Sequence, residues 1–173
     1  MSLDSSELRE KAQTLRAGMK VLLSGTVYTA RDTAHKRFLE LINSGESLPF
    51  PLDGAAIYYA GPTPAKPGKP IGSCGPTTSG RMDGFAPTLL NLGLSAMIGK
   101  GERNAAVKEA IKKNGAVYFA AIGGAGALAA ASITSSEVIA FPELGCESVK
   151  RLVFKDFPLI VAIDSHGGDI FDR

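Results

Sequence analysis

The sequence predicts an α/β fold, from its length, its composition and the alternation of apolar runs with helical patterns. The chain has 173 residues, the usual size of one domain, so we expect a single domain over residues 1–173. Hydrophobic residues make up 45% and charged residues 21%, which is ordinary for a globular protein and argues against disorder. Short apolar runs typical of buried strands alternate with helically spaced segments, an order typical of α/β proteins.

The first segment is polar with apolar residues at helical spacing, so it predicts an amphipathic helix. Leu8, Ala12 and Leu15 share one face, and Ser5 or Ser6 is the expected N-cap. The segment lacks the apolar stretch of a signal peptide, which leads us to expect a cytoplasmic protein.

The rest of the chain contains further expected elements. The expected strands are residues 21–29, 55–60, 95–98, 116–122, 137–141 and 159–164. The expected helices are residues 32–43, 84–92, 104–114 and 126–131. Asn104 is a good N-cap, and Gly93 and Gly115 stand where C-cap glycines are common.

Residues 61–76 interrupt this alternation. They read GPTPAKPGKPIGSCGP, with five prolines and four glycines in 16 residues. Proline removes a backbone donor and cannot occupy the interior of a helix or sheet. We therefore expect a long loop inside the domain, a kind of segment that often carries function.

Composition and charge exclude several classes of protein. Nineteen Lys and Arg residues against seventeen Asp and Glu residues leave a net charge of +2, which is too small for a nucleic-acid surface. No stretch approaches the roughly 18 continuous apolar residues of a transmembrane helix. We therefore expect neither nucleic acid nor a membrane as a partner.

The sequence offers little for binding a metal. Cys74 and Cys146 are far apart, which fits a reducing compartment. The only histidines are His35 and His166, and neither belongs to a spaced ligand set, so no metal ligand is assigned. Residues 164–169, DSHGGD, are interpreted as a polar turn after the last strand, with acid–base chemistry as the alternative.

The segment after the loop has the composition of an anion site. Thr77, Thr78 and Arg81 stand in TTSGRMD, just before an apolar helical pattern. Hydroxyl groups, free backbone N–H groups at a helix N-terminus and a guanidinium together suit a carboxylate or a phosphate. The commoner interpretation is a capped helix whose arginine is only solvated.

A second cation, Arg31, follows the strand at residues 21–29. It therefore stands at the carboxyl end of a strand, where α/β folds usually bind ligands. His35 and Lys36 come one helical turn later. We interpret them as an exposed basic helix face capped by Asp32.

Two glycine-rich segments also follow predicted strands. In IGKG, Lys100 lies between two glycines, but the spacing of a P-loop is missing. Residues 122–127, IGGAGA, begin like a dinucleotide fingerprint, but Ala129 stands at its last glycine position. We interpret the glycines of this segment as packing glycines. A stand-alone module that binds an anion or a nucleotide stays open as an alternative.

Five longer segments carry a resemblance to a known enzyme family. They are GTVYTARDTAHKRF, YYAGPTPAKPGKPIGSCGPTTSGRMDGF, MIGKGERN, YFAAIGGAGALAA and FPLIVAIDSHGGDIF. Together they resemble the β subunit of class I, iron–sulfur-dependent fumarate hydratase, the C-terminal domain of single-chain forms. GPTTSGRMD together with IGKG is highly specific to this family. The β subunit of L-tartrate dehydratase shares the pattern and is the alternative.

The resemblance implies a fold, a reaction and a partner. The fold would be a three-layer, swivelling β/β/α domain, and the reaction the reversible hydration of fumarate to L-malate. In this family a four-iron, four-sulfur cluster is held by cysteines of the other domain or subunit. The resemblance therefore implies a hetero-oligomer, active only with an α subunit that binds the cluster, while this chain does not.

The resemblance also implies roles for five residues. Arg81 and Lys100 match the family's clamps on the substrate carboxylates, and Thr78 is expected either to donate to the ligand or to cap the helix. Thr77 matches its catalytic threonine, which exchanges the proton at the carbon beside a carboxylate, and Arg31 matches the arginine near that threonine. These roles suit the reaction, because cations stabilise the negative charge that develops on the carboxylate.

Overall fold

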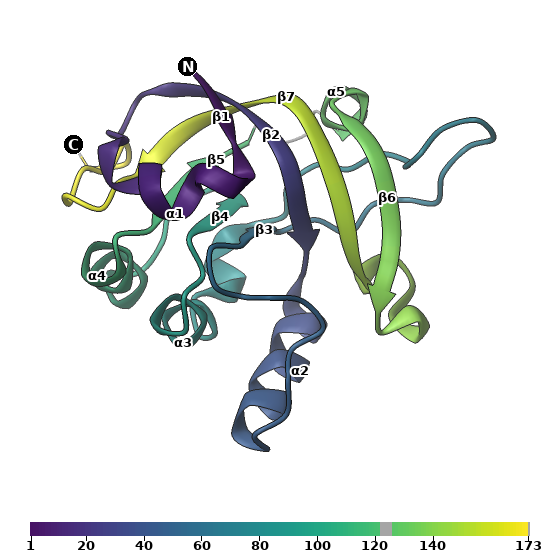
Figure 1. The fold of residues 1–173 in the computed structure, drawn as a ribbon, viewed down its shortest axis with the longest axis horizontal. Coiled ribbons are helices and arrows are strands. Elements are labelled where there is room, and N and C mark those ends of the chain that lie inside the picture. Colours follow the sequence, from purple (N-terminus) through teal and green to yellow (C-terminus); the bar gives the residue numbers. More distant parts are fainter. Residues whose placement is uncertain (122–125, 173) are drawn as a thin grey trace.

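The computed structural model describes residues 1–121 and 126–172, which form one mixed sheet with helices packed against it (Figure 1). Most of the glycine-rich segment interpreted above as a packing turn, residues 122–125, lies outside the described residues. The predicted α/β class is confirmed.

The bounds of most elements agree with the expected ones. The strands are β1 (Ser2–Asp4), β2 (Lys20–Thr29), β3 (Ala56–Tyr58), β4 (Ala96–Gly99), β5 (Val117–Ala120), β6 (Ile133–Ala140) and β7 (Val149–Ile163). The α-helices are α1 (Leu8–Lys11), α2 (Asp32–Asn43), α3 (Ala86–Asn91), α4 (Ala105–Asn114) and α5 (Gly126–Ala131). Short 3-10 helices cover Ser5–Glu7, Ala12–Thr14, Ser79–Met82 and Pro142–Glu147.

Two long strands, β2 and β7, close the sheet on itself. One edge of β2 pairs in parallel first with β1 and then with β3, and its other edge pairs antiparallel with β7. β7 in turn pairs with β5 and β6. Because β3, β4 and β5 are parallel neighbours, the five strands β2–β3–β4–β5–β7 form a ring, to which β1 and β6 are added.

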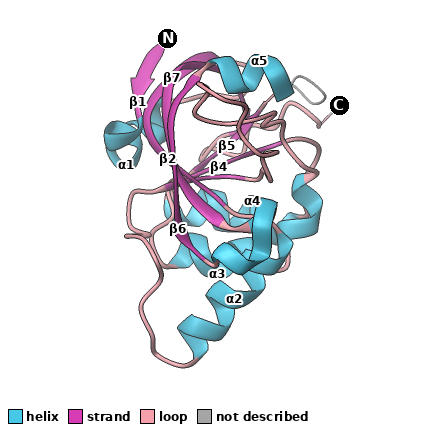
Figure 2. Ribbon diagram, turned by 90° about the vertical axis from the view of Figure 1, so that its right-hand side faces the viewer, coloured by secondary structure: helices cyan, strands magenta, loops and turns pink. Residues whose placement is uncertain are grey.

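Apolar cores lie on both faces of this sheet. The ring encloses one core, which contains Leu23, Tyr58 and Phe119. The second core contains residues such as Phe38 and Tyr59, and lies between the sheet and helices α2, α3 and α4, which cover the same side in Figure 2. The sheet therefore has an apolar core on each side, and helices α2, α3 and α4 cover the second one.

The N-terminal segment differs from the single helix that was predicted. Residues 2–4 form a strand beside β2, and the helical part is broken into three short pieces. The cap is Asp4 and not Ser5 or Ser6, because its carboxylate accepts a hydrogen bond from the backbone N–H of Ser6 at 2.9 Å. The three apolar residues expected to share a face are buried.

The largest difference is at β7, which begins ten residues before the predicted strand. Its first part contains Lys150, Arg151, Lys155 and Asp156, so its outer face is charged and it lacks the apolar run that was used to find strands. β6 likewise begins four residues early, at Ile133, which is the one buried residue of this strand.

The proline-rich residues 61–76 form a loop without regular structure, as predicted, and project from the body of the molecule (Figure 1). The loop turns back on itself, since Thr63 N–H donates to the carbonyl of Ser73 at 3.0 Å. The turn expected after the last strand is also present: the carboxylate of Asp164 accepts hydrogen bonds from the backbone N–H groups of residues 17, 166 and 168.

Candidate functional site

The carboxyl ends of the parallel strands β2, β3 and β4 meet at one edge of the sheet. Arg31 follows the end of β2, Tyr59 follows β3, and Lys100 follows β4. This is the edge where ligands bind in open α/β sheets. Two of the five predicted site residues therefore come to the same place through the topology alone.

The segment that holds Thr77 and Thr78 lies along this edge. The backbone N–H of Thr77 donates to the carbonyl of Tyr59 at 2.7 Å. Thr78 pairs with Lys100 as an isolated parallel bridge, and Ser79 N–H donates to the Lys100 carbonyl at 2.9 Å. Main-chain bonds thus fix both threonines beside Lys100.

The helix expected over residues 84–92 is present as α3, which begins at Ala86, and a 3-10 helix that was not predicted, Ser79–Met82, separates it from the two threonines. Thr78 precedes the 3-10 helix, but its side chain makes no capping hydrogen bond. Its exposed hydroxyl is therefore not engaged as a cap, which removes the main support for the capped-helix interpretation.

Glycine at position 99 permits the close approach of this segment to β4. A Cβ added to Gly99 would clash with Oγ of Ser79 and would lie 2.8 Å from Cδ2 of Tyr59. The packing of residues 77–79 against β4 therefore requires a residue without a side chain at position 99.

Arg31 lies against the first residue of the proline-rich loop. A Cβ added to Gly61 would lie 3.0 Å from both Cδ and Nη1 of Arg31. The Nε of Arg31 is buried and has no hydrogen-bond partner among residues 1–121 and 126–172. Because a buried donor without a partner costs roughly 1–3 kcal/mol, this group is suited to meet an acceptor on a ligand.

Arg81 is brought to the site by an ion pair with the first residue of α2. Its Nη2 lies 2.5 Å from Oδ2 of Asp32, and the two side chains are 50% and 34% exposed. Asp32 is inside the helix and does not cap it as predicted, since Arg31 occupies the N-cap position. The other oxygen of Asp32, Oδ1, is buried and finds no partner within the described residues.

His35 contradicts its prediction as an exposed residue, because its side chain is fully buried. Its Nδ1 lies 2.8 Å from the Arg31 carbonyl, so this nitrogen carries the proton, and its ring packs edge-on against Tyr59. Burial lowers the pKa of His35 to about 4, which keeps the imidazole neutral. Lys36 is exposed, as predicted.

Sequence reasoning also missed Arg103, whose side chain is completely buried beneath the site. Its Nε donates to Oδ1 of Asp83 at 2.6 Å, and its Nη2 donates to the hydroxyl of Tyr59 at 3.2 Å. Its place in the segment GKGERN, three residues after Lys100, is the one signal that could have drawn attention to it.

Neither cysteine stands in a group of possible metal ligands within the described residues. Cys74 and Cys146 are free, and burial raises the pKa of Cys74 to about 12, so its thiol stays protonated. In the part of the chain that the structure describes, no three His, Cys, Asp or Glu side chains gather in a way that could hold a metal ion. The same part contains no helix that is long and apolar enough to cross a membrane.

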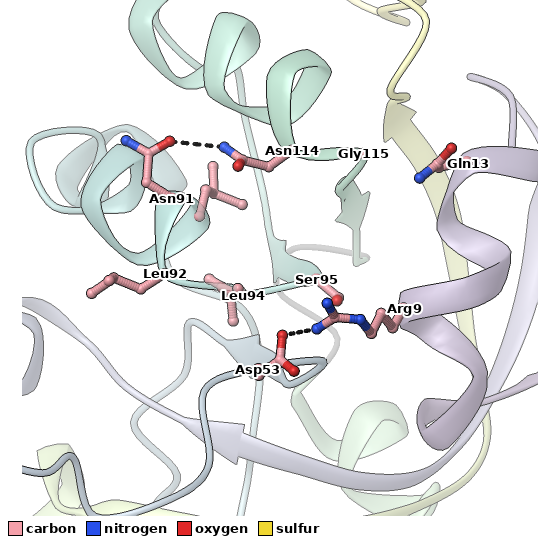
Figure 3. Close-up of a pocket in the computed structure, with 11 residues that line it drawn as sticks. Arg9, Gln13, Asp53, Asn91, Leu92, Leu94, Ser95, Asn114 and Gly115 are labelled. Atoms are coloured by element: carbon pink, nitrogen blue, oxygen red, sulfur yellow. Dashed lines mark hydrogen bonds and ion pairs between the residues drawn. The ribbon is translucent and has the colours of Figure 1, made fainter.

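A polar cavity of about 420 Å³ lies at the opposite edge of the sheet, where β3, β4 and β5 begin (Figure 3). Arg9 at its rim is already paired with Asp53. Across the cavity, Nδ2 of Asn114 donates to Oδ1 of Asn91 at 2.9 Å. None of the predicted site residues lines this cavity, so we place the candidate site at the carboxyl edge.

The arrangement at the carboxyl edge suits a small dianion. It combines the cations Arg31, Arg81 and Lys100 with the hydroxyl groups of Thr77 and Thr78, all within segments that the main chain or an ion pair joins. Arginine side chains bind carboxylates through paired hydrogen bonds, and lysine binds them as a point charge.

Comparisons with known proteins agree with the resemblance found in the sequence. The family model described as Fumarase C-terminus matches residues 1–173. Fumarate hydratase 2 of Leishmania major is 39% identical over 169 residues, which are 96% of this chain and 30% of that protein. The anaerobic class I fumarate hydratase of Escherichia coli is 42% identical over 89% of this chain and 28% of its own length.

A relative of similar length has a different name. The L(+)-tartrate dehydratase subunit beta of Escherichia coli is 36% identical over 93% of this chain and 81% of its own length. This chain therefore spans about 30% of the fumarate hydratases that it matches, but most of the tartrate dehydratase subunit.

Proposed function

Because the chain belongs to the fumarase C-terminus family, we propose that it is the β subunit of a fumarate hydratase, which hydrates fumarate reversibly to L-malate. The observation that carries this proposal is the meeting of Arg31, Thr77 and Lys100 at one edge of the sheet, with Arg81 held beside them. Its relatives named as fumarate hydratases are about three times longer, so the proposal includes a partner that supplies the rest of the enzyme.

Lys100 and Arg81 would bind the two carboxylates of the substrate. Lys100 is fixed by its bridge to Thr78, and the hydroxyl of Thr78 is free to donate to the same ligand. Arg81 would exchange its contact with Asp32 for a substrate carboxylate. A dicarboxylate would thus be oriented between two cations before the reaction begins.

Thr77 would take the proton from the carbon beside a carboxylate, or return it in the opposite direction. A threonine hydroxyl is a weak base and needs an activating neighbour. Arg31 supplies a cation at this edge, and its unpartnered Nε is a donor that could stabilise the negatively charged oxygen of Thr77. The cations would also stabilise the charge that develops on the carboxylate.

The cluster belongs to the partner in this proposal, because the described residues of this chain do not fit a cluster site. When bound there, the cluster would supply a Lewis acid for the hydroxyl group that leaves or enters the substrate. The α subunit that carries it would form a hetero-oligomer with this chain. The relative named as a subunit beta supports this assembly, because this chain covers 81% of that protein.

A second candidate is the β subunit of an L-tartrate dehydratase. The length of the relative with that name favours it, since this chain covers 81% of that protein. Tartrate keeps the two carboxylates of a four-carbon acid and adds hydroxyl groups, so the same cations could bind it. The contacts to those hydroxyl groups would decide between the two substrates.

The test is anaerobic turnover of fumarate and L-tartrate, measured side by side on this chain purified together with its α subunit. The chain alone is the control. We expect turnover of fumarate by the complex and none by the chain alone. Preference for tartrate would establish the second candidate. If the complex holds an intact cluster and turns over neither acid, both proposals fail. Binding of a nucleotide by the isolated chain would favour a binding module.

A further inference from the structure

A buried, charged network lies directly beneath the candidate site, and the proposed reaction does not use it. At its centre is Arg103, whose side chain has no exposed surface. Its guanidinium is bonded to Asp83 at 2.6 Å and to the hydroxyl of Tyr59 at 3.2 Å. Its central carbon also lies 5.2 Å from the ring centre of Tyr59 and 4.8 Å from that of Tyr118. Two nitrogens of the guanidinium are therefore hydrogen-bonded, and its central carbon lies within cation–π distance of both tyrosine rings.

The hydroxyl of Tyr118 extends this network toward the site. It lies 2.8 Å from the Gly101 carbonyl and 2.8 Å from Oγ of Ser79. A carbonyl can only accept, so the single hydroxyl proton of Tyr118 is donated to Gly101. The Ser79 hydroxyl must then donate to the oxygen of Tyr118. Burial raises the pKa of Tyr118 to about 12, so its proton is kept.

The network contacts both segments that carry site residues. On one side, Tyr59 accepts the N–H of Thr77 through its carbonyl, and Ser79 is bonded to Tyr118. On the other side, Gly101 is the residue after Lys100. Asp83 joins the two sides as well, because its second oxygen accepts the N–H of Asn104 at 2.8 Å.

We propose that Arg103 is a positioning residue, which fixes residues 77–82 against Lys100. It acts through its contacts with Tyr59, Asp83 and Tyr118. The inference rests on the proposed function, in which Arg81 and Lys100 bind the two ends of a dicarboxylate. The network would fix the separation of these two cations, and with it the length of the acid that they bind. Loosening the network allows the separation to vary, and selectivity for the length of the acid is lost with the rate.

The first variant is Tyr118→Phe in the complex with the α subunit. It removes one hydroxyl and keeps the ring that packs on Arg103, so the fold should survive. The control is Asp164→Asn, which alters a buried carboxylate in the turn after β7, away from the site. Arg103→Lys is a second variant, which keeps the charge but loses the fork that bonds Asp83 and Tyr59 together.

Three measurements separate positioning from a purely structural role. Hydrogen exchange of the peptide that spans residues 77–82 should become at least tenfold faster in Tyr118→Phe and should stay unchanged in Asp164→Asn. kcat should fall at least tenfold in Tyr118→Phe. In Asp164→Asn, kcat should stay unchanged even if this variant loses as much melting temperature as Tyr118→Phe does. The ratio of inhibition constants for glutarate and succinate, which have five and four carbons, should fall at least threefold in Tyr118→Phe.

The outcomes distinguish this inference from the proposed function. Unchanged exchange at residues 77–82 in Tyr118→Phe overturns the positioning role. In an active complex, an unchanged glutarate-to-succinate ratio overturns it too. A wild-type complex that turns over neither fumarate nor tartrate rejects the proposed function. In that case the exchange experiment, which needs no substrate, still decides whether the network holds the segment.

Discussion

Nη2 of Arg81 lies 2.5 Å from Oδ2 of Asp32, so the arginine proposed to bind a substrate carboxylate already holds a carboxylate of its own chain. Both side chains are partly exposed, and ion pairs of this kind contribute only about 0–1 kcal/mol to stability. A ligand carboxylate can therefore displace Asp32 at low cost. The ion pair places Arg81 near its ligand position and competes weakly with the ligand.

Replacing Asp32 by Asn should tighten the binding of a dicarboxylate. The amide keeps the shape of the side chain but removes the charge that competes for Arg81. Since such ion pairs are worth about 0.2–1 kcal/mol, we expect up to about a fivefold decrease in the inhibition constant of succinate in the complex. Asp53→Asn is the matched control, because Asp53 pairs with Arg9 at the opposite edge. Weaker binding in Asp32→Asn would show that the ion pair orients Arg81 more than it competes.

Arg81→Lys should weaken the same binding by roughly tenfold, because lysine cannot form the paired hydrogen bonds of a guanidinium. The inhibition constant of succinate measures the effect. Arg9→Lys, on an exposed residue near the opposite cavity, provides the control. An unchanged constant in Arg81→Lys would mean that Arg81 does not contact the substrate.

Thr77→Ala should reduce kcat of the complex by about 10²–10⁴-fold, the usual range for loss of a group that transfers a proton. Assembly with the α subunit should persist, because the main-chain bond from Thr77 to Tyr59 does not involve the side chain. Thr134→Ala, on the exposed strand β6, tests for a general effect of the substitution. Near-normal turnover in Thr77→Ala would remove this residue from its proposed role.

His35 should make stability depend on pH. Burial lowers its pKa from 6.5 to about 4 in the folded protein, so between these values the unfolded chain takes up a proton that the folded protein does not. The stabilisation is complete above pH 6.5 and is lost progressively as the pH falls toward 4, by roughly 3 kcal/mol in total. Denaturant unfolding between pH 7.5 and 4 measures this loss.

His35→Asn is the variant that tests whether His35 causes this pH dependence of stability. Its amide can still donate to the Arg31 carbonyl, but it does not titrate. The variant should be less stable at pH 7.5 and should lose much less stability on acidification. His166→Asn, at an exposed position, is the matched control for the substitution itself. Equal slopes in His35→Asn and the wild type would place the pH dependence elsewhere.

Cys74→Ser and Cys146→Ser should leave the iron content of the complex unchanged, because neither thiol lies in a group of ligands within the described residues. Cys74→Ser should cost some stability, since its side chain is buried in the inner core. Iron and sulfide are measured per complex. Loss of iron in either variant would show that this chain contributes a cluster ligand.

Much of the fold could be predicted because it depends on local patterns. α2 was predicted with its observed bounds, since apolar spacing and the polar residues at its start are visible in the sequence. β1 could not be found, because three residues acquire their strand structure only from pairing with β2. The first part of β7 was missed for a related reason: it is charged on one face, and only its two neighbours make it a strand.

Some features of the candidate site could likewise be predicted from local sequence, and others could not. Arg31, Thr77 and Lys100 could be predicted because each stands in a segment of distinctive composition. The burial of His35 could not, because it depends on packing against Tyr59 and Phe85, which are distant in the sequence. Arg103 was missed because its partner Asp83 is 20 residues away and its other contacts are tyrosines of β5 and of the segment after β3.

The bonds that join Thr77 to Tyr59, and Thr78 and Ser79 to Lys100, are made by the main chain. Substitution of the exposed side chains leaves such bonds in place, so the spacing at this edge persists as long as the buried network of Arg103 and Tyr118 beneath it is kept. During evolution, a change of substrate in this fold would thus require new side chains at a few exposed positions and no rebuilding of the scaffold. Enzymes for differently substituted four-carbon acids could then diverge from one ancestor in a small number of steps.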